Sequence, residues 1–212
     1  MARLWYRRRM KYRALALALL VAAPLAIGLS PHAPLQGPRS AEASVAVLIS
    51  LEDLTAASTY VVVATAGEQR SAWEETPSGK RIVTYTRLKV DRSVAGPAET
   101  ELWVRTLGGV VDKIGQSVSG EAQIASGSQS LLFLAKVNVG LVVVGMAQGH
   151  YPIVDPSTTP KAAAPRLAGS PDAGMLLPRR GPTISARERL LGLTVDDAVL
   201  AVQRARKATD AK

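Results

Sequence analysis

The stretch Ser130–Tyr151 constrains the fold of this chain more than any other, because its apolar runs are short and separated by turn residues. Two of these runs, Leu131–Val137 and Leu141–Ala147, are rich in Val and Leu and are joined by Asn138–Gly140. Short apolar runs bounded by Gly or Asn favour buried strands over helices. The stretch therefore predicts two strands connected by a tight turn, with a third strand after Gln148-Gly149.

Two further segments alternate apolar and polar residues with a period of two, as strands with one buried face do. They are Ile82–Asp91 and Glu101–Leu107, and their expected inward residues are Ile82, Thr84, Thr86, Leu88, Val90, Leu102, Val104 and Thr106. The β-branched run Tyr60–Ala66 predicts another strand, and the glycine-containing stretch Val110–Gly127 a weak strand and a loop. About five to seven short antiparallel strands indicate a small barrel or sandwich, and closure would remove exposed edges.

Two other local patterns flank these strands. Ser50 is placed to accept the free amides at the start of a short helix, Leu51–Ser58. The polar stretch Glu68–Lys80 is interpreted as a connection that contains a turn at Pro77–Gly79. The sequence therefore predicts a helix before the first strand and a long polar loop after it.

The order of these motifs resembles that of a group of exported bacterial proteins with a compact OB-like barrel. The resemblance covers about Leu51–Val154 and depends on these segments: the helix Ser50–Leu54, the strand Val61–Val63, Thr84-Tyr-Thr86, Leu107-Gly-Gly109, Leu131-Leu-Phe-Leu134 and Val143–Gly149. It implies a mainly β fold, a small antiparallel OB-like barrel, and export, but no activity. A weaker similarity is to netrin-like protease-inhibitor barrels, which use an N-terminal cysteine to chelate a protease's metal. This chain contains no cysteine.

The N-terminus has the three zones of an export signal. Six cations lie in Met1–Arg13, and Ala14–Leu29 is a run of sixteen residues without a charge. A spanning helix needs about 20 apolar residues, whereas a secretory signal needs about 7–15. Ala41-Glu-Ala43 offers the small residues that signal peptidase recognises. We therefore expect residues 1–43 to be a signal peptide and the bacterial chain to be periplasmic or secreted. The alternative is a single-pass protein anchored by residues 14–29.

The formal charge of +9 is concentrated at this N-terminus, because seven of the 26 Lys and Arg residues precede residue 44. The remainder carries an ordinary mixture of charges, which together with export argues against a nucleic-acid partner. The absence of cysteine excludes disulfides, thiolate zinc sites and a cysteine nucleophile. Contact with a membrane is expected only through residues 14–29, if the signal is not cleaved.

The C-terminal part differs in composition from the predicted barrel domain, residues 44–155. Residues 156–183 hold six of the thirteen prolines and predict a disordered linker, because they offer little apolar surface to bury. A capping box at Ser185–Glu188 and a cap at Thr194 predict helices in residues 184–212. The longer helix carries one apolar stripe: Val195, Ala198, Val199 and Val202. This stripe must dock on the barrel, a second copy or a partner, while residues 44–155 are expected to fold without it.

No catalytic constellation is visible, so we expect neither an enzyme, a metal site nor a cofactor. His150 is interpreted as a polar turn residue, and nothing brings Asp112, Glu121 and Asp155 together. The preferred function is an exported non-catalytic binding or accessory protein. The alternatives are a structural protein that acts through its C-terminal helix, or an unrecognised hydrolase.

One surface is a candidate for binding. If Ile82–Asp91 pairs with Glu101–Leu107, their outward faces bring together two aromatic rings and three cations: Tyr85, Arg87, Lys89, Trp103 and Arg105. Rings interleaved with cations bind anionic sugars by stacking and charge pairing, so the expected partner is an anionic glycan or an acidic patch of an envelope protein. The alternative is a solvated hairpin face with Arg87 packed over Trp103. The glycine-rich loop Gly108–Gly127 is the next surface to consider.

Overall fold

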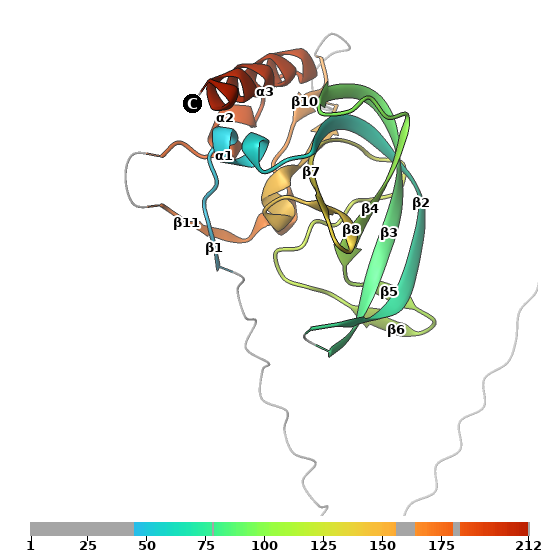
Figure 1. The fold of residues 1–212 in the computed structure, drawn as a ribbon. Coiled ribbons are helices and arrows are strands. Elements are labelled where there is room, and N and C mark those ends of the chain that lie inside the picture. Colours follow the sequence, from blue (N-terminus) through green and yellow to red (C-terminus); the bar gives the residue numbers. More distant parts are fainter. Residues whose placement is uncertain (1–44, 78, 156–163, 180–182, 212) are drawn as a thin grey trace, which may run out of the picture. The chain divides into compact units, whose positions relative to one another are not determined.

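Five strands of the chain form a closed ring (Figure 1). The structure is a computed structural model that describes residues 45–77, 79–155, 164–179 and 183–211. The expected export signal at residues 1–43, with its alternative anchor at 14–29, lies outside these residues. No helix in the described ranges is long and apolar enough to cross a membrane.

The ring closes because β7 pairs with both β2 and β8. Following the ring, the strands run β2, β3, β4, β8 and β7, and β7 returns to β2. Only the β4–β8 pair in this ring is parallel. Their bounds are β2 Tyr60–Thr76, β3 Gly79–Ala95, β4 Glu101–Leu107, β7 Gln129–Val137 and β8 Gly140–Val143. The predicted mainly β fold, with a ring of strands, is confirmed.

The remaining elements extend or cover the ring. β9 pairs with β7 and carries β10 at its other edge, β5 and β6 form a hairpin, and β1 pairs in parallel with β11. The bounds of these strands are β1 Val45–Val47, β5 Gly109–Val111, β6 Ile114–Gln116, β9 His150–Val154, β10 Arg166–Leu167 and β11 Met175–Leu177. The helices are α1 Leu51–Ala56, α2 Ala186–Leu190 and α3 Val195–Asp210, with 3₁₀ turns η1 at Met146–Gly149 and η2 at Pro171–Ala173.

Strand alternation creates two apolar cores that share the same strands. On β2, Val62 and Ala64 belong to the core inside the ring, whereas Val61 and Val63 point to a second core outside it. β7 alternates in the same way, and Phe133 on its outer face is fully buried. Since both faces of these strands are covered, the runs of apolar residues in the sequence have no polar alternation.

The outer core lies between the ring and the three helices, which gather on one side of the ring (Figure 1). Ser50, Ser185 and Thr194 cap α1, α2 and α3 by accepting a backbone amide three residues on, as predicted. The apolar stripe of α3 packs in this core with Leu54 of α1. The stripe therefore docks within its own chain. The expectation that residues 44–155 form a separate domain is wrong, because the C-terminal helices supply part of the core.

The prediction of a disordered linker over residues 156–183 is wrong for residues 164–179, while residues 156–163 and 180–182 lie outside the described residues. Leu167 is 2% exposed in the outer core, and its backbone bonds to Gly192 and Leu193. Ala173 contributes to the inner core. Single apolar residues docked in preformed sites, together with β10 and β11, order this proline-rich stretch.

Two strand predictions need correction. The expected strand Leu141–Ala147 ends early as β8, because Gly145 adopts a left-handed conformation (φ 63°) and η1 follows. A Cβ on Gly145 would lie 2.5 Å from Ile49 Cδ1, so both the turn and the close approach require glycine. The polar stretch Glu68–Thr76 is not a loop but the second half of β2, paired with β3 up to Thr76 and Gly79.

Candidate functional site

The five candidate residues lie in the predicted register on β3 and β4. Tyr85 is opposite Arg105, and Arg87 is opposite Trp103. Arg87 and Lys89 are exposed, as predicted, and Tyr85 and Trp103 are half-buried. Arg105 is only 8% exposed, so the expectation that it faces solvent is wrong. The continuation of β2 beyond the ring covers it.

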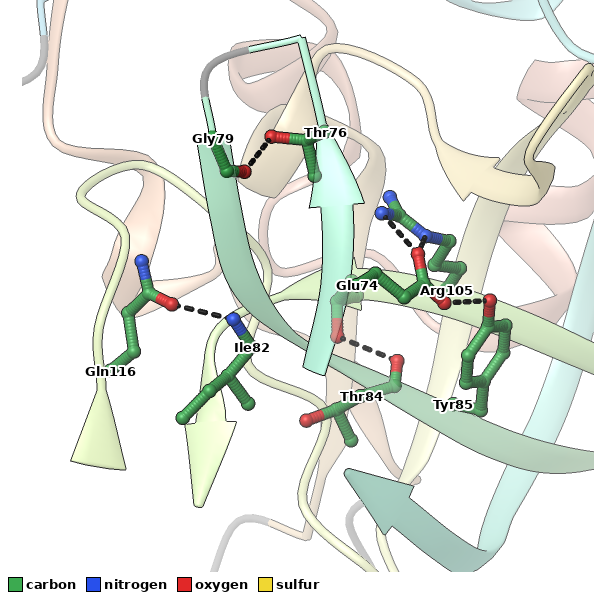
Figure 2. A network of polar contacts seen from close by, with 9 residues as sticks. Glu74, Thr76, Gly79, Ile82, Thr84, Tyr85, Arg105 and Gln116 are labelled. Atoms are coloured by element: carbon green, nitrogen blue, oxygen red, sulfur yellow. Dashed lines mark hydrogen bonds and ion pairs between the residues drawn. The ribbon is translucent and has the colours of Figure 1, made fainter. Parts of the chain in front are cut away.

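Glu74, from this continuation of β2, binds both Arg105 and Tyr85 (Figure 2). The Tyr85 hydroxyl donates to Glu74 Oε1 at 2.5 Å, and Arg105 donates to Oε2 through Nη2 at 2.8 Å and Nε at 3.1 Å. The Tyr85 hydrogen bond, supported by Arg105, lowers the pKa of Glu74, and the same bond raises the pKa of Tyr85. These groups satisfy one another and leave no free charge for a ligand.

The two arginines beside Trp103 also have carboxylate neighbours. Arg87 Nη1 lies 3.7 Å from Glu101 Oε2. The guanidinium over the Trp103 ring belongs to Arg70, at 5.5 Å from the ring centroid, and not to Arg87 as expected. Arg70 is itself paired with Glu68 at 2.7 Å. The β3–β4 surface is therefore a mixed-charge network, and its attraction for an anionic ligand is weaker than the sequence implies.

A cleft of about 520 Å³ lies where the β5–β6 hairpin and the loop 117–125 meet β3 and β4. We call it the β5–β6 cleft. Figure 1 shows the hairpin at the end of the ring away from α3. Fifteen residues line the cleft and none of them is charged, while Gln69, Thr84, Thr106, Gln116 and Gln123 provide polar side chains. This volume is within the range of about 300–1,000 Å³ typical of small-molecule sites.

Side-chain hydrogen bonds to the backbone fix the walls of the cleft. Thr84 donates to the Gly108 carbonyl at 2.7 Å. Gln116 accepts from the Ile82 amide at 2.6 Å (Figure 2). A Cβ on Gly109 would lie 2.2 Å from Thr84 Oγ1, and the φ of 131° at Gly109 also favours glycine. The pair of glycines at the end of β4 thus lets the hairpin pack closely against β3.

Glu121 is a buried carboxyl group directly behind the cleft. It is 8% exposed and accepts hydrogen bonds from the amides of Leu107 and Ala122, both of which line the cleft. Burial raises the pKa of Glu121 to about 7, although these amides and the charge of Arg105 oppose the shift. The sequence offered Glu121 as one of three separated acids, with no signal that it would be buried.

His150 is not a turn residue, since it begins β9 and is 2% exposed. Its Nε2 atom lies 3.1 Å from Ser130 Oγ, and burial lowers the pKa of His150 to about 4, opposed by the charge of Asp172. Asp172 instead accepts from the Gln123 amide and the Ser170 hydroxyl. Ser130 is 1% exposed, so its hydroxyl is not accessible to a substrate, and no acid among the described residues is bonded to His150. Within the described ranges, no group of three or more His, Asp or Glu side chains is arranged to hold a metal ion.

Comparison with protein-family models, curated proteins and solved structures finds no match to this chain.

Proposed function

We propose that this chain is an exported, non-catalytic binding protein that holds a neutral, hydroxyl-rich glycan in the β5–β6 cleft. The observation that carries the proposal is the lining of the cleft: about 520 Å³ in volume, with amide, hydroxyl and backbone groups and no charged side chain. Such groups hydrogen-bond to sugar hydroxyls without the desolvation penalty of a charge. The uncharged lining favours a neutral glycan over an anionic one.

The scaffold of this function is proposed to be an OB-like barrel. When the five ring strands are numbered along the chain, their order around the ring is 1-2-3-5-4. The third and fifth strands, β4 and β8, are parallel. This arrangement supports the OB-like assignment made from the sequence motifs. The export signal expected at residues 1–43 supports an envelope location for the glycan.

Three alternatives are less well supported. The apolar stripe of α3 is occupied by the outer core, so this face is not open to a partner. The carboxylate pairing of Arg87 and Arg105 weakens the case for an anionic glycan on the β3–β4 surface. A hydrolase would need a general acid or base in the cleft, and none of the lining residues is one.

The binding test uses calorimetric titration with neutral oligosaccharides of hexose and N-acetylhexosamine, and with a uronic-acid oligosaccharide. Ala125 is exposed and lines the cleft, so Ala125→Trp should fill the space and weaken neutral-glycan binding by at least about tenfold. Gln123→Ala removes an exposed polar side chain from the same wall and should weaken it less.

The matched control is Ala98→Trp, which places the same ring on an exposed turn outside the cleft and should bind normally. A double variant, Arg87→Ala with Lys89→Ala, tests the β3–β4 surface. If the double variant lost binding and Ala125→Trp kept it, the ligand would lie on that surface and the proposed site would be wrong. Absence of binding to every oligosaccharide would reject a glycan-binding function.

A further inference from the structure

A second pocket lies where β9, η2, β11 and α2 meet. We call it the His150 pocket. Its walls include the apolar residues Ile49 and Leu176, and its polar groups come from His150, Tyr151 and Arg187. The enclosed space is about 10 Å³, enough for one water-sized group, and it continues into a wider mouth.

One polar atom of this pocket has no partner. His150 Nδ1 is fully buried and makes no hydrogen bond within the described part of the chain. The other ring nitrogen, Nε2, faces Ser130 Oγ, for which the structure gives no other hydrogen bond. When the Ser130 hydroxyl donates to Nε2, a neutral imidazole carries its proton on Nδ1. The pocket then contains a buried N–H donor that lacks an acceptor.

A cation lies at the mouth of the same pocket. Arg187, on α2, is exposed and makes no ion pair among the described residues, whereas Arg189 on the same helix binds Glu52. The Arg187 guanidinium packs against Gly169: a Cβ on Gly169 would lie 2.9 Å from its Nε and 3.0 Å from its Cζ. The glycine therefore provides the space that keeps the cation over the mouth.

The nearby acids are already occupied. Asp172, whose charge acts on His150, accepts from the Gln123 amide and from Ser170. Glu188 of α2 closes the capping box with Ser185. Tyr151 is uncharged, because burial raises the pKa of its hydroxyl, although the nearby charge of Arg187 opposes the shift. The unsatisfied groups of the pocket are therefore a donor at depth and a cation at the mouth, and both require an acceptor.

We propose that the His150 pocket binds a carboxylate group, with one oxygen accepting from His150 Nδ1 and the negative charge facing Arg187. The enclosed space of about 10 Å³ admits a single oxygen atom, which a carboxylate supplies as an acceptor. The carboxylate belongs either to a small free acid or to the C-terminus of a peptide, and both present the same group to the pocket. This site is separate from the proposed glycan cleft and does not depend on it.

The test follows the imidazole of His150 by nuclear magnetic resonance during titration with formate and acetate, against sodium chloride at equal ionic strength. The chain has two histidines, so the signals are readily assigned. We expect saturable shifts with Kd in the millimolar range, as for ligands of few atoms. The bound anion should also raise the pKa of His150, since it stabilises the imidazolium.

Three variants separate the proposed site from other causes. Arg187→Gln removes the cation and Gly169→Ala displaces it, so each should weaken binding by at least about fivefold. Arg189→Gln, on the same helix but bound to Glu52, should leave binding unchanged. A tripeptide with a free C-terminus, compared with its amide, tells whether the source is a peptide end: tighter binding than acetate assigns it to a peptide, and weaker binding to a small acid.

Three results would overturn the proposal. If His150 showed no saturable response to formate, the buried donor would be satisfied by water alone. If Arg187→Gln bound formate as tightly as the unmodified protein, the response would not come from a carboxylate at this mouth. Chloride that shifted the His150 signals as strongly as formate would reject the specificity for a carboxylate.

Discussion

A chain that ends at residue 194, before α3, should lose cooperative folding. Four residues of α3 are buried in the outer core: Ala198, Val199, Val202 and Ala205. Burying one valine contributes roughly 1.5–3 kcal/mol, so the two valines account for about 3–6 kcal/mol of a total that is typically about 5–15 kcal/mol. Their loss would also expose Leu54 of α1. Circular dichroism and urea denaturation of the truncated chain would check this result.

A pair of substitutions in the full-length protein makes the same test without deleting the helix. Val202 is completely buried, so Val202→Asp should lower the free energy of unfolding by more than about 3 kcal/mol, since it removes apolar burial and adds a buried carboxyl group. Leu200 is 49% exposed on the same helix, and Leu200→Asp should change it by less than about 1 kcal/mol. Equal effects of the two substitutions, or a cooperative truncated chain, would show that α3 is not part of the core.

The second large effect is on the pH dependence of stability, through Glu121. Its folded-state pKa of about 7 is above the ordinary value of 4.5, so the folded state holds the proton more tightly. The stability from this group is complete below pH 4.5 and is lost as the pH rises through 7. A difference of this size corresponds to about 3 kcal/mol. Glu121→Gln removes this dependence.

His150 acts in the opposite direction. Its folded-state pKa of about 4 is below the ordinary 6.5, so its contribution is complete above pH 6.5 and is lost as the pH falls towards 4. The two groups therefore nearly cancel between pH 4.5 and 6.5 in the unmodified protein. In Glu121→Gln, His150 remains of these two groups, and the free energy of unfolding should rise by about 3 kcal/mol from pH 4 to 6.5.

Urea denaturation at several pH values, with exposed Glu99→Gln as the control, measures this difference. The control should follow the unmodified protein at every pH. Parallel curves for Glu121→Gln and the unmodified protein between pH 4 and 8 would mean that Glu121 is ionised in the fold at little cost. The amides of Leu107 and Ala122 would then offset its burial completely.

Most strands were predictable because each has a local pattern of apolar residues in the sequence. β7 is an uninterrupted apolar run, and Ile82–Asp91 alternates, so both segments are recognisable as strands. The alternation assigns Val83 to the outward face, but this residue is completely buried. Glu68–Thr76 was not identified, because a strand that continues beyond the ring is polar on both faces and has no apolar period. Because this strand was not predicted, Glu74 was not expected near Arg105. The contact between these two residues explains why Arg105 is buried.

The sites were less predictable, because their properties arise from contacts between distant segments. Leu167 is a lone apolar residue among prolines, and only its docking in the outer core orders the chain around it. The neighbours of His150 suggested a turn, yet β7, η2 and α2 enclose it. The glycine-rich loop 108–127 was named as a second binding surface, and its glycines were the one signal of the β5–β6 cleft.

The packing of α1 against α3 also determines when the chain can complete its folding during synthesis. α1 lies at the start of the described residues and α3 at their end, so the outer core cannot form until synthesis has reached α3. Contacts between segments so far apart in sequence also form slowly. If the protein is exported as proposed, the N-terminal portion would remain incompletely folded until α3 is made. In that state it could pass through a translocation channel. Completion of the fold would then be confined to the far side of the membrane.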